Sequence, residues 1–325
     1  MKPKVLVTRE IFDEIIEALK SRFEITANQA DEAWSPEALA ERLADKEGVM
    51  TSIVDKVDAA LLDRAPRLKA VCNIAVGYNN IDVAECTRRG ILVTNTPGVL
   101  DDATADFTWA LILGAARRLT EAEAYLRNGE WKRWELKQLL GADVHGATLG
   151  IVGMGRIGQA VARRAAGFDM KVLYWNRNRV APEIEQRCNA TFASRDELLA
   201  QSDFVTLHCP YSPETHHLIG AAELKRMKRS AILVNAARGG VVDDAALVAA
   251  LKDGTIAAAG LDVYEGEPGL NAGFLGLGNV VLAPHIASST RTTRFNMAQK
   301  AADNLVAALT GGEPPNLVNP EAKKR

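Results

Sequence analysis

The sequence has few cysteines and almost no net charge. Its 325 residues include four cysteines and carry a formal net charge of −2. None of the cysteines lies in a C-x-x-C pair, and all four are expected within strands or helices: Cys72, Cys86, Cys188 and Cys209. This pattern excludes a disulfide or zinc framework and indicates buried or idle thiols in a reducing compartment. We therefore expect a cytoplasmic protein with no metal.

Long apolar stretches are also missing. No apolar run reaches the roughly 20 residues that a membrane-spanning helix needs. The segment Met1–Val7 has too short an apolar core for a secretory signal and is typical of a first strand. A net charge near zero gives no electrostatic reason to expect a nucleic-acid partner. These absences argue against membrane-spanning and nucleic-acid-binding functions.

Strand and helix patterns alternate along the chain. A length of 325 residues has room for two domains, each with its own core. Buried-strand patterns occupy 5–7, 48–50, 70–74 and 91–94, and Ser35 followed by Pro36 indicates a capped helix start between them. A long helix is expected over 104–119, and further strands over 204–208, 231–235, 260–263 and 280–282. The pattern predicts an α/β protein with two doubly wound, Rossmann/flavodoxin-like domains and parallel sheets.

A glycine-rich turn separates a strand from a helix near the middle of the chain. Leu149–Val152 is apolar, Gly153, Gly155 and Gly158 give the spacing G-x-G-x-x-G, and a helical pattern and a second strand at 172–175 follow. The first glycine permits the turn, the second admits a pyrophosphate to the backbone, and the third allows close helix packing. The alternative is a glycine turn without a ligand. In this context the pattern favours a dinucleotide site.

The end of the second strand bears on which dinucleotide binds. NAD-binding folds usually place a carboxylate there, about 20 residues after the glycines, to bind the ribose 2′-hydroxyl. This strand instead continues into Asn176, Arg177, Asn178 and Arg179, with no acid before Glu183. Guanidinium groups bind phosphate with charge-assisted hydrogen bonds, so we expect a preference for NADPH over NADH. The alternative is that both arginines are solvated loop residues.

Three residues suit the reduction of a carbonyl group by a nicotinamide. His285 follows a buried strand and is a natural proton donor near neutral pH. Arg238 lies just past another strand and could bind a carboxylate and polarise the adjacent keto oxygen. Glu267 could favour the imidazolium form of His285, although a solvated loop role stays open. The other histidines fit loop, surface or core positions: His145, His208, His216 and His217.

Taken in order, seven motifs resemble the family of D-isomer-specific 2-hydroxyacid dehydrogenases. They cover essentially the whole chain, and the branch that the chain resembles is that of bacterial glyoxylate/hydroxypyruvate reductases, which also reduce 2-ketogluconate. The motifs are Val76-Gly77-Tyr78-Asn79-Asn80-Ile81-Asp82, Thr94-Asn95-Thr96-Pro97-Gly98, the glycine motif, Asn235-x-x-Arg238-Gly239, Gly260-Leu-Asp-Val263, Glu267-Pro268 and Pro284-His285.

The resemblance implies roles for individual residues. Arg238 would bind the substrate carboxylate and carbonyl, Glu267 would partner the acid, and His285 would donate the proton. The substrate would also meet the backbone amides of Val76 and Gly77, together with Ser288 and, from a partner subunit, Trp134 or the nearby Trp131. The residues expected around the cofactor are Thr104, Gly153, Met154, Gly155, Arg156, Ile157, Gly158, Asn176, Arg177, Arg179, Pro210, Ala236 and Asp262; Asp262 would bond the nicotinamide carboxamide.

The resemblance also implies an organisation of the chain. A discontinuous substrate domain would comprise 1–98 and 290–325, and a dinucleotide-binding domain would comprise 99–289, with the active site in the cleft between them. A homodimer would form through the coenzyme domains. The expected function is the NADPH-preferring reduction of small 2-keto acids (glyoxylate, hydroxypyruvate and 2-ketogluconate) to D-2-hydroxy acids, with NADH as a second cofactor. The alternatives are another enzyme of the family, such as a short phosphoglycerate dehydrogenase, and a dinucleotide-sensing binding protein.

Overall fold

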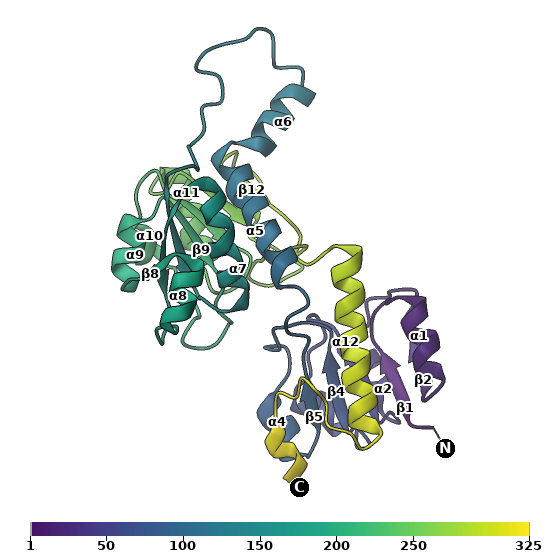
Figure 1. Ribbon diagram of the computed structural model, residues 1–325. Helices are drawn as coiled ribbons and strands as arrows, with labels where there is room; N and C mark the ends of the chain where they lie inside the picture. The colour runs from purple at the N-terminus through teal and green to yellow at the C-terminus, as the bar shows by residue number, and fades with distance from the viewer. Residues whose placement is uncertain (1, 325) are drawn as a thin grey trace. The chain divides into compact units, whose positions relative to one another are not determined.

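The computed structural model describes residues 2–324, which divide into two compact units. Unit 1 comprises the chain up to Leu100 and again from Thr290, and unit 2 comprises Asp101–Ser289. Each unit is built on one sheet in which every neighbouring pair of strands is parallel (Figure 1). The predicted α/β class with two parallel sheets is confirmed.

Unit 1 has five strands in the order β2-β1-β3-β4-β5, the doubly wound order of flavodoxin-like sheets. The strands are β1 (Lys4–Val7), β2 (Glu24–Ala27), β3 (Gly48–Thr51), β4 (Ala70–Asn73) and β5 (Leu92–Thr94). The helices are α1 (Asp13–Lys20), α2 (Pro36–Leu43), α3 (Ala59–Asp63), α4 (Val83–Arg88) and α12 (Arg291–Leu309), with a short 3-10 helix η3 (Pro320–Lys324). The Ser35 hydroxyl accepts the amide of Ala38, which confirms the predicted cap of α2.

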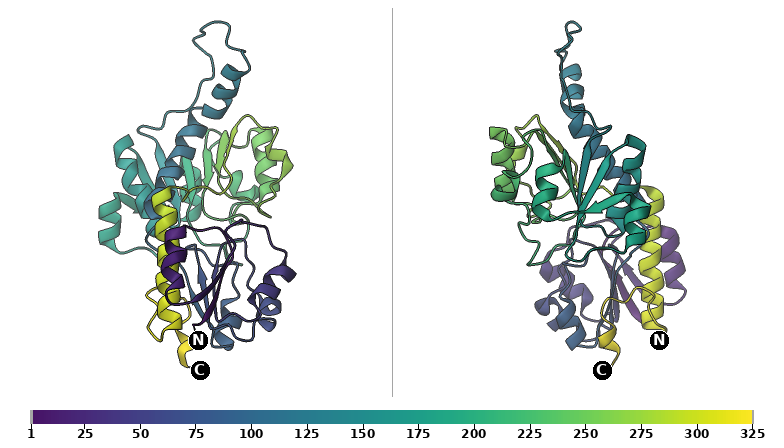
Figure 2. Two further views of the ribbon diagram at one scale, coloured as in Figure 1. Left: turned by 90° about the vertical axis from the view of Figure 1, so that its right-hand side faces the viewer. Right: turned by 60° about the vertical axis from the view of Figure 1, so that its left-hand side comes forward.

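Helices cover both faces of this sheet because its strands are apolar on both sides. In β1, Val5 and Val7 face the layer of α1 and α12, whereas Leu6 faces the layer of α2, α3 and α4. Helix α12 lies beside α1 (Figure 2). It contributes Ala301 and Leu305 to the core. A segment almost 200 residues further along the chain therefore completes the N-terminal fold.

Unit 2 has seven strands in the order β12-β11-β10-β9-β6-β7-β8, so the order reverses between β6 and β9. The strands are β6 (Thr148–Val152), β7 (Lys171–Trp175), β8 (Ala190–Phe192), β9 (Phe204–Leu207), β10 (Ile232–Asn235), β11 (Ala258–Leu261) and β12 (Val280–Leu282). The helices are α5 (Asp101–Ala116), α6 (Leu119–Arg127), α7 (Arg156–Ala165), α8 (Pro182–Cys188), α9 (Arg195–Gln201), α10 (Ala221–Leu224) and α11 (Asp244–Asp253), with 3-10 helices η1 (Ala166–Phe168) and η2 (Ala272–Phe274).

Alternate residues of each central strand enter two separate core layers. In β10, Leu233 packs on the α9, α10 and α11 side, and Ile232 and Val234 pack on the α5, α7 and α8 side. No helix within residues 2–324 is both long and apolar enough to cross a membrane.

The structure corrects two local predictions. The helix expected over 104–119 begins earlier and ends at Ala116, because Arg118 adopts a left-handed backbone conformation (φ 53°) and starts the separate helix α6. Cys209, expected within a regular element, lies in the loop after β9, whereas Cys72, Cys86 and Cys188 lie in β4, α4 and α8. All four cysteines are free thiols, and burial raises the pKa of Cys209 to about 11, so this thiol is inert at neutral pH.

Candidate active site

The polar groups singled out in the sequence follow the carboxyl ends of neighbouring strands in unit 2. Gly153 follows β6, Arg238 follows β10, Asp262 follows β11, and His285 follows β12. In a parallel sheet these ends share one edge, and ligands bind there, beside the point where the strand order reverses. This edge therefore carries the candidate active site.

The glycine turn is shaped by close backbone contacts on two of its three glycines. Gly153 has φ 103°, and a Cβ there would lie 2.7 Å from the amide nitrogen of Cys209. A Cβ on Gly158 would lie 2.1 Å from the carbonyl oxygen of Gly153. A Cβ on Gly155, in contrast, would meet no atom of the described chain within 4 Å. The middle glycine leaves open the approach that a pyrophosphate needs.

Helix α7 begins at Arg156, directly after the open glycine, and runs for ten residues. Its first-turn amides have no carbonyl of the helix within reach and point toward the glycine turn, where the helix dipole favours an anion. Arg156 is exposed, Ile157 is half-buried, and Met154 is buried in the core beneath the turn. The turn, the open glycine and the helix start together fit a dinucleotide phosphate.

The segment after β7 holds the glycine turn and carries two arginines with different surroundings. The Asn176 side-chain oxygen accepts the amide of Met154 at 2.6 Å. Arg177 is exposed. Arg179 forms a two-pronged ion pair with Glu185, with nitrogen–oxygen distances of 2.7 and 2.8 Å, and this pairing lowers the pKa of Glu185 to about 2. Arg179 is therefore already engaged by a carboxylate, a contact that the sequence did not reveal.

His285 and Glu267 form a short hydrogen-bonded pair. The Nδ1 atom of His285 lies 2.6 Å from Oε2 of Glu267, and each side chain is about one-quarter exposed (24% and 25%). The other carboxylate oxygen of Glu267 accepts the amide of Tyr264 at 2.8 Å. Burial raises the pKa of Glu267, but the His285 hydrogen bond and nearby positive charge outweigh burial and hold this pKa below its usual value. The pair leaves Nε2 as the ring nitrogen of His285 that can face a ligand.

Arg238 lies in a loop that Asn235 fixes. The side-chain amide of Asn235 donates to the carbonyl oxygen of Arg238 (3.1 Å), and its oxygen accepts the amide of Ala237 (3.1 Å). Burial lowers the pKa of Arg238 and the charge of Glu267 opposes this shift, but an arginine stays protonated under these conditions. The loop therefore presents a fixed positive charge whose field reaches the Glu267–His285 pair.

Asp262 holds the backbone on either side of His285. Its two carboxylate oxygens accept the amides of Ile286 (2.7 Å) and Ala287 (2.8 Å), and its carbonyl oxygen accepts the amide of His285 (2.9 Å). Asp262 is fully buried, and this burial raises its pKa against the effect of the two amides. His285 itself adopts a left-handed backbone conformation with φ 55°. The carboxylate predicted to meet the nicotinamide thus also anchors the loop of the predicted acid.

Tyr264 supports the same loop from a second side. Its hydroxyl donates to the carbonyl oxygen of Ala283 (2.9 Å) and accepts the amide of Ala283 (3.1 Å), one residue before Pro284. Its own amide holds Glu267. The sequence analysis did not single out Tyr264, and only its place between Asp262 and Glu267 could have drawn attention to it.

The remaining predicted residues of unit 2 lie in varied surroundings. Thr104 is buried in α5, Ala236 is buried after β10, Pro210 is exposed after β9, and Ser288 is half-buried beyond His285.

His208 differs from His285 in its protonation. Burial lowers the pKa of His208 to about 3, so its ring is neutral near pH 7 and unsuited to donating a proton as a cation. This difference leaves His285 as the better acid on this edge.

In unit 1, Val76 and Gly77 lie in the loop after β4. The side chain of Asn95 donates to the carbonyl oxygen of Val76 (2.8 Å), and that of Asn73 donates to the carbonyl oxygen of Gly77 (2.8 Å). The first contact orients the peptide group that carries the Gly77 amide, and the bond from the Thr96 amide to the Ala75 carbonyl oxygen (3.0 Å) orients the peptide group that carries the Val76 amide. Sequence reasoning named the two amides but missed the asparagines that orient the loop.

Helix α6 and the segment after it extend away from the body of unit 2 (Figure 1). Large apolar side chains along this stretch are exposed. Trp134 is 73% exposed and Trp131 is 53% exposed. Further exposed leucines share this stretch: Leu119, Leu126, Leu136 and Leu140. We call the segment 117–140 the arm.

Known proteins resemble this chain over its whole length. The family profile described as "D-isomer specific 2-hydroxyacid dehydrogenase, NAD binding domain" matches residues 109–287. Glyoxylate reductases of Thermococcus gammatolerans and Thermococcus kodakarensis are each 52% identical to this chain over 328 residues, covering 100% of this chain and 98% of each relative.

Solved structures show the same fold. A protein from Thermus thermophilus superposes with a TM-score of 0.90 at 45% identity, covering 97% of this chain and 99% of that one. An NADPH-dependent glyoxylate/hydroxypyruvate reductase from Sinorhizobium meliloti, solved with NADP and malonate, superposes with a TM-score of 0.88 at 34% identity, covering 99% and 98%.

Proposed function

Because the chain belongs to the D-isomer specific 2-hydroxyacid dehydrogenase family, we propose that it reduces small 2-keto acids to D-2-hydroxy acids. Glyoxylate and hydroxypyruvate are the proposed substrates, and 2-ketogluconate is a further one. The names of the relatives support glyoxylate and hydroxypyruvate as substrates. The observation that carries the proposal is the 2.6 Å contact between His285 and Glu267, within the field of Arg238.

The proposed chemistry assigns one step to each of these groups. The bound nicotinamide cofactor supplies the hydride that reduces C2 of the keto acid. His285 donates the proton from Nε2 to the former keto oxygen, which becomes the hydroxyl group of the product. Glu267 keeps His285 oriented through its contact with Nδ1. Arg238 binds the substrate carboxylate and stabilises negative charge that develops on the oxygen.

The backbone amides of Val76 and Gly77 are proposed as additional donors to the substrate carboxylate, with Ser288 nearby. Their support is the contact of Asn95 with the Val76 carbonyl oxygen, which orients the Gly77 amide, and the contact of the Thr96 amide with the Ala75 carbonyl oxygen, which orients the Val76 amide. By the same proposal, residues 1–98 and 290–325 form the substrate domain and 99–289 form the dinucleotide-binding domain.

The cofactor residues are proposed from the glycine turn outward. Thr104, Gly153, Met154, Gly155, Arg156, Ile157, Gly158, Pro210 and Ala236 would surround the dinucleotide, and Asp262 would face the nicotinamide carboxamide. Asn176, Arg177 and Arg179 would accept the 2′-phosphate of NADPH, the preferred cofactor. Arg177 is the principal contact in this proposal because Arg179 already pairs with Glu185.

Initial rates of NADPH oxidation with glyoxylate, hydroxypyruvate, 2-ketogluconate and phenylpyruvate test the activity. We expect fast turnover of the first two. Tight cofactor binding without turnover of any keto acid would contradict the proposal and favour a dinucleotide-sensing protein. A rate with 3-phosphohydroxypyruvate far above that with glyoxylate would instead indicate a short phosphoglycerate dehydrogenase.

The cofactor preference has its own test in two matched variants. Arg177→Ala should lower the ratio of kcat/KM with NADPH to kcat/KM with NADH by about 10-fold or more, the size of one lost charged hydrogen bond. Arg179→Ala should lower the ratio less. A wild-type enzyme that uses NADH at least as efficiently as NADPH would disprove the preference.

A homodimer is the proposed assembly, with a second copy covering the arm. Exposed apolar side chains concentrated on one projecting segment are typical of an association surface. Trp134 is proposed to reach the partner's substrate pocket. Light scattering should show a dimer, and Leu136→Glu combined with Leu140→Glu should yield monomers. Trp134→Ala should raise KM while the dimer persists; an unchanged KM would exclude its proposed role.

A further inference from the structure

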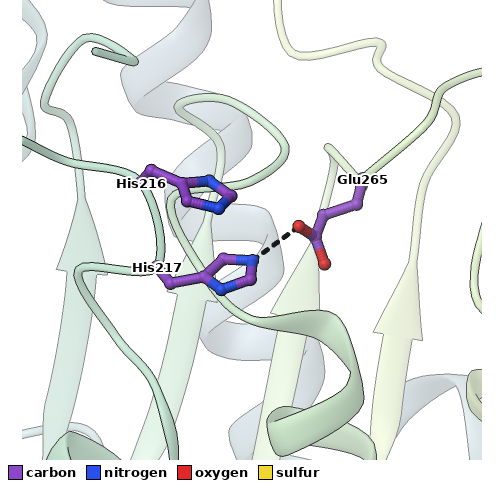
Figure 3. A group of neighbouring side chains, drawn as sticks. All are labelled: His216, His217 and Glu265. Atoms are coloured by element: carbon purple, nitrogen blue, oxygen red, sulfur yellow. Dashed lines mark hydrogen bonds and ion pairs between the residues drawn. The ribbon is translucent and has the colours of Figure 1, made fainter. Parts of the chain in front are cut away.

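Unit 2 contains a second cluster of imidazole and carboxylate groups beyond the proposed catalytic residues. His216 and His217 lie in the loop between β9 and α10, and Glu265 follows β11 (Figure 3). One potential ligand atom from each of the three lies within 4.8 Å of the others. His216 is exposed, and the other two side chains are about one-third exposed, so an ion can reach them from solvent.

The two imidazoles differ in what lies beside Nδ1. The His216 Nδ1 atom lies 3.3 Å from the hydroxyl of Tyr211. The His217 Nδ1 atom lies 3.9 Å from Oδ2 of Asp243, too far for a direct hydrogen bond, and its Nε2 atom lies 2.7 Å from Oε1 of Glu265. A histidine that binds a metal typically uses one ring nitrogen for the ion and the other for a carboxylate or similar group. Tyr211 gives His216 this arrangement, the Asp243 carboxylate lies on the corresponding side of His217, and Nε2 is then the ligand atom of both rings.

We propose that His216, His217 and Glu265 bind one divalent transition-metal ion of the Zn²⁺ type, with a water molecule in the fourth position. Two imidazoles and one carboxylate suit Zn²⁺, whereas Mg²⁺ and Ca²⁺ prefer oxygen ligands alone. The sequence had suggested no metal site because its cysteines lack the required spacing. This site instead joins residues that lie 48 positions apart in the chain.

The geometry requires two local adjustments before an ion can bind. The two rings are stacked, with centroids 3.9 Å apart and planes 25° apart, so their lone pairs do not yet converge. Ligand atoms about 2.0–2.1 Å from a tetrahedral ion lie about 3.4 Å from each other, whereas Nε2 of His217 and Oε1 of Glu265 lie 2.7 Å apart in a hydrogen bond. The ion would therefore replace this hydrogen bond and separate the two atoms, while the exposed His216 ring turns toward them.

The ion would connect three loops on this edge of the sheet. The amide of His217 donates to the carbonyl oxygen of Gly240 (2.8 Å), in the loop that begins at Arg238. Glu265 lies two residues before Glu267, and its amide donates to Asp244 (3.0 Å). An ion that binds only the folded arrangement of these loops raises the melting temperature.

Zinc titration of the chelator-stripped, tag-free protein tests the proposal. Isothermal calorimetry with Zn²⁺ should give one ion per chain and Mg²⁺ should give none. His216→Ala should weaken zinc binding by more than the roughly 10–100-fold that loss of an outer partner costs, and Tyr211→Phe should fall within that range. Thermal unfolding should show a zinc-dependent rise in melting temperature that His216→Ala removes.

Matched variants separate this site from other histidines. His145→Ala, at an exposed position in unit 2, and His285→Ala should both retain zinc binding. Glu265→Gln removes a second ligand and should also abolish zinc binding. Circular dichroism verifies that each variant is folded. The proposal is overturned by the absence of saturable zinc binding, by binding that survives both His216→Ala and Glu265→Gln, or by binding that disappears in His285→Ala. These outcomes do not depend on the reductase activity.

Discussion

Two histidine–glutamate pairs in unit 2 have nearly the same contact distance, although His285 meets its carboxylate through Nδ1 and His217 through Nε2. His285 lies 2.6 Å from Glu267, and His217 lies 2.7 Å from Glu265. Both histidines have a left-handed backbone conformation, with φ 55° and 50°, and both glutamates come from the loop after β11. The pairs differ in what surrounds them.

The field of Arg238 reaches the first pair, and the buried carboxylate of Asp262 anchors its backbone. The second pair lies against another imidazole, His216, and near Asp243. A neighbouring cation suits the binding of an anionic substrate, whereas a second imidazole suits the binding of a metal ion. The comparison teaches that the pair itself does not determine its chemistry; its neighbours do.

The largest expected difference is in turnover. His285→Ala should lower kcat by about 10²–10⁴-fold, the usual contribution of a general acid, while the Kd for NADPH stays nearly unchanged. His217→Ala should lose far less kcat, and its main effect should be on the melting temperature. Steady-state kinetics measures kcat, and fluorescence titration measures the Kd for NADPH. Near-normal turnover by His285→Ala would remove the proposed distinction between the pairs.

The glutamates should differ in their effect on catalytic efficiency. Glu267→Gln should lower kcat/KM by about 10–100-fold, in line with the loss of a charged hydrogen bond to His285. Glu265→Gln should leave kcat/KM nearly unchanged, because its partner His217 has no assigned part in the reaction. Steady-state kinetics of both variants measure this difference. An equal loss of kcat/KM in both variants would show that the two pairs are coupled.

Asp262→Asn should destabilise the loop of the first pair only. An amide replaces one oxygen acceptor with a donor, which leaves the backbone amide of Ile286 or Ala287 buried without its bond, at a cost of about 1–3 kcal/mol. Urea unfolding measures this loss. If Asp262 positions His285, kcat should fall with little change in the KM for the keto acid. Wild-type stability together with wild-type kcat would argue against an anchoring role.

The smallest expected effect is a change of stability with pH. Because the pKa of Glu267 is lower in the folded state than in the unfolded chain, its charged form stabilises the fold above the unfolded value of about 4.3, and this contribution disappears as the pH falls through the folded value. The stability difference between wild type and Glu267→Gln should therefore narrow from pH 7 to pH 4. A gap that widens on acidification would contradict the assigned direction.

Local patterns in the sequence predicted much of this fold. Apolar strand runs, the Ser35 cap and the glycine turn depend on nearby residues, so the sequence shows them directly. The break at Arg118 was not predicted, because a left-handed arginine between two helical patterns has no strong local signal.

Only some residues of the candidate site could be predicted from the sequence. Residue type and position after a strand pointed to Arg238, Glu267 and His285. The partners that position them were harder to find, because the contacts of Asp262 with Ala287 and of Tyr264 with Ala283 join different strand ends. The pairing of Arg179 with Glu185 was missed for a related reason, since only the folded turn shows which charges meet.

Helix α12 has a consequence for how the protein forms on the ribosome. Unit 2 is one continuous stretch of chain, so it can be complete as soon as Ser289 has left the exit tunnel. The sheet of unit 1 is synthesised first, yet one of its faces is covered only in part, by α1, until Ala301 and Leu305 arrive. Domains usually fold in the order of synthesis. Here unit 2 can complete its fold first, although it is synthesised second. Until α12 is synthesised, unit 1 exposes apolar surface that a nascent-chain chaperone would recognise.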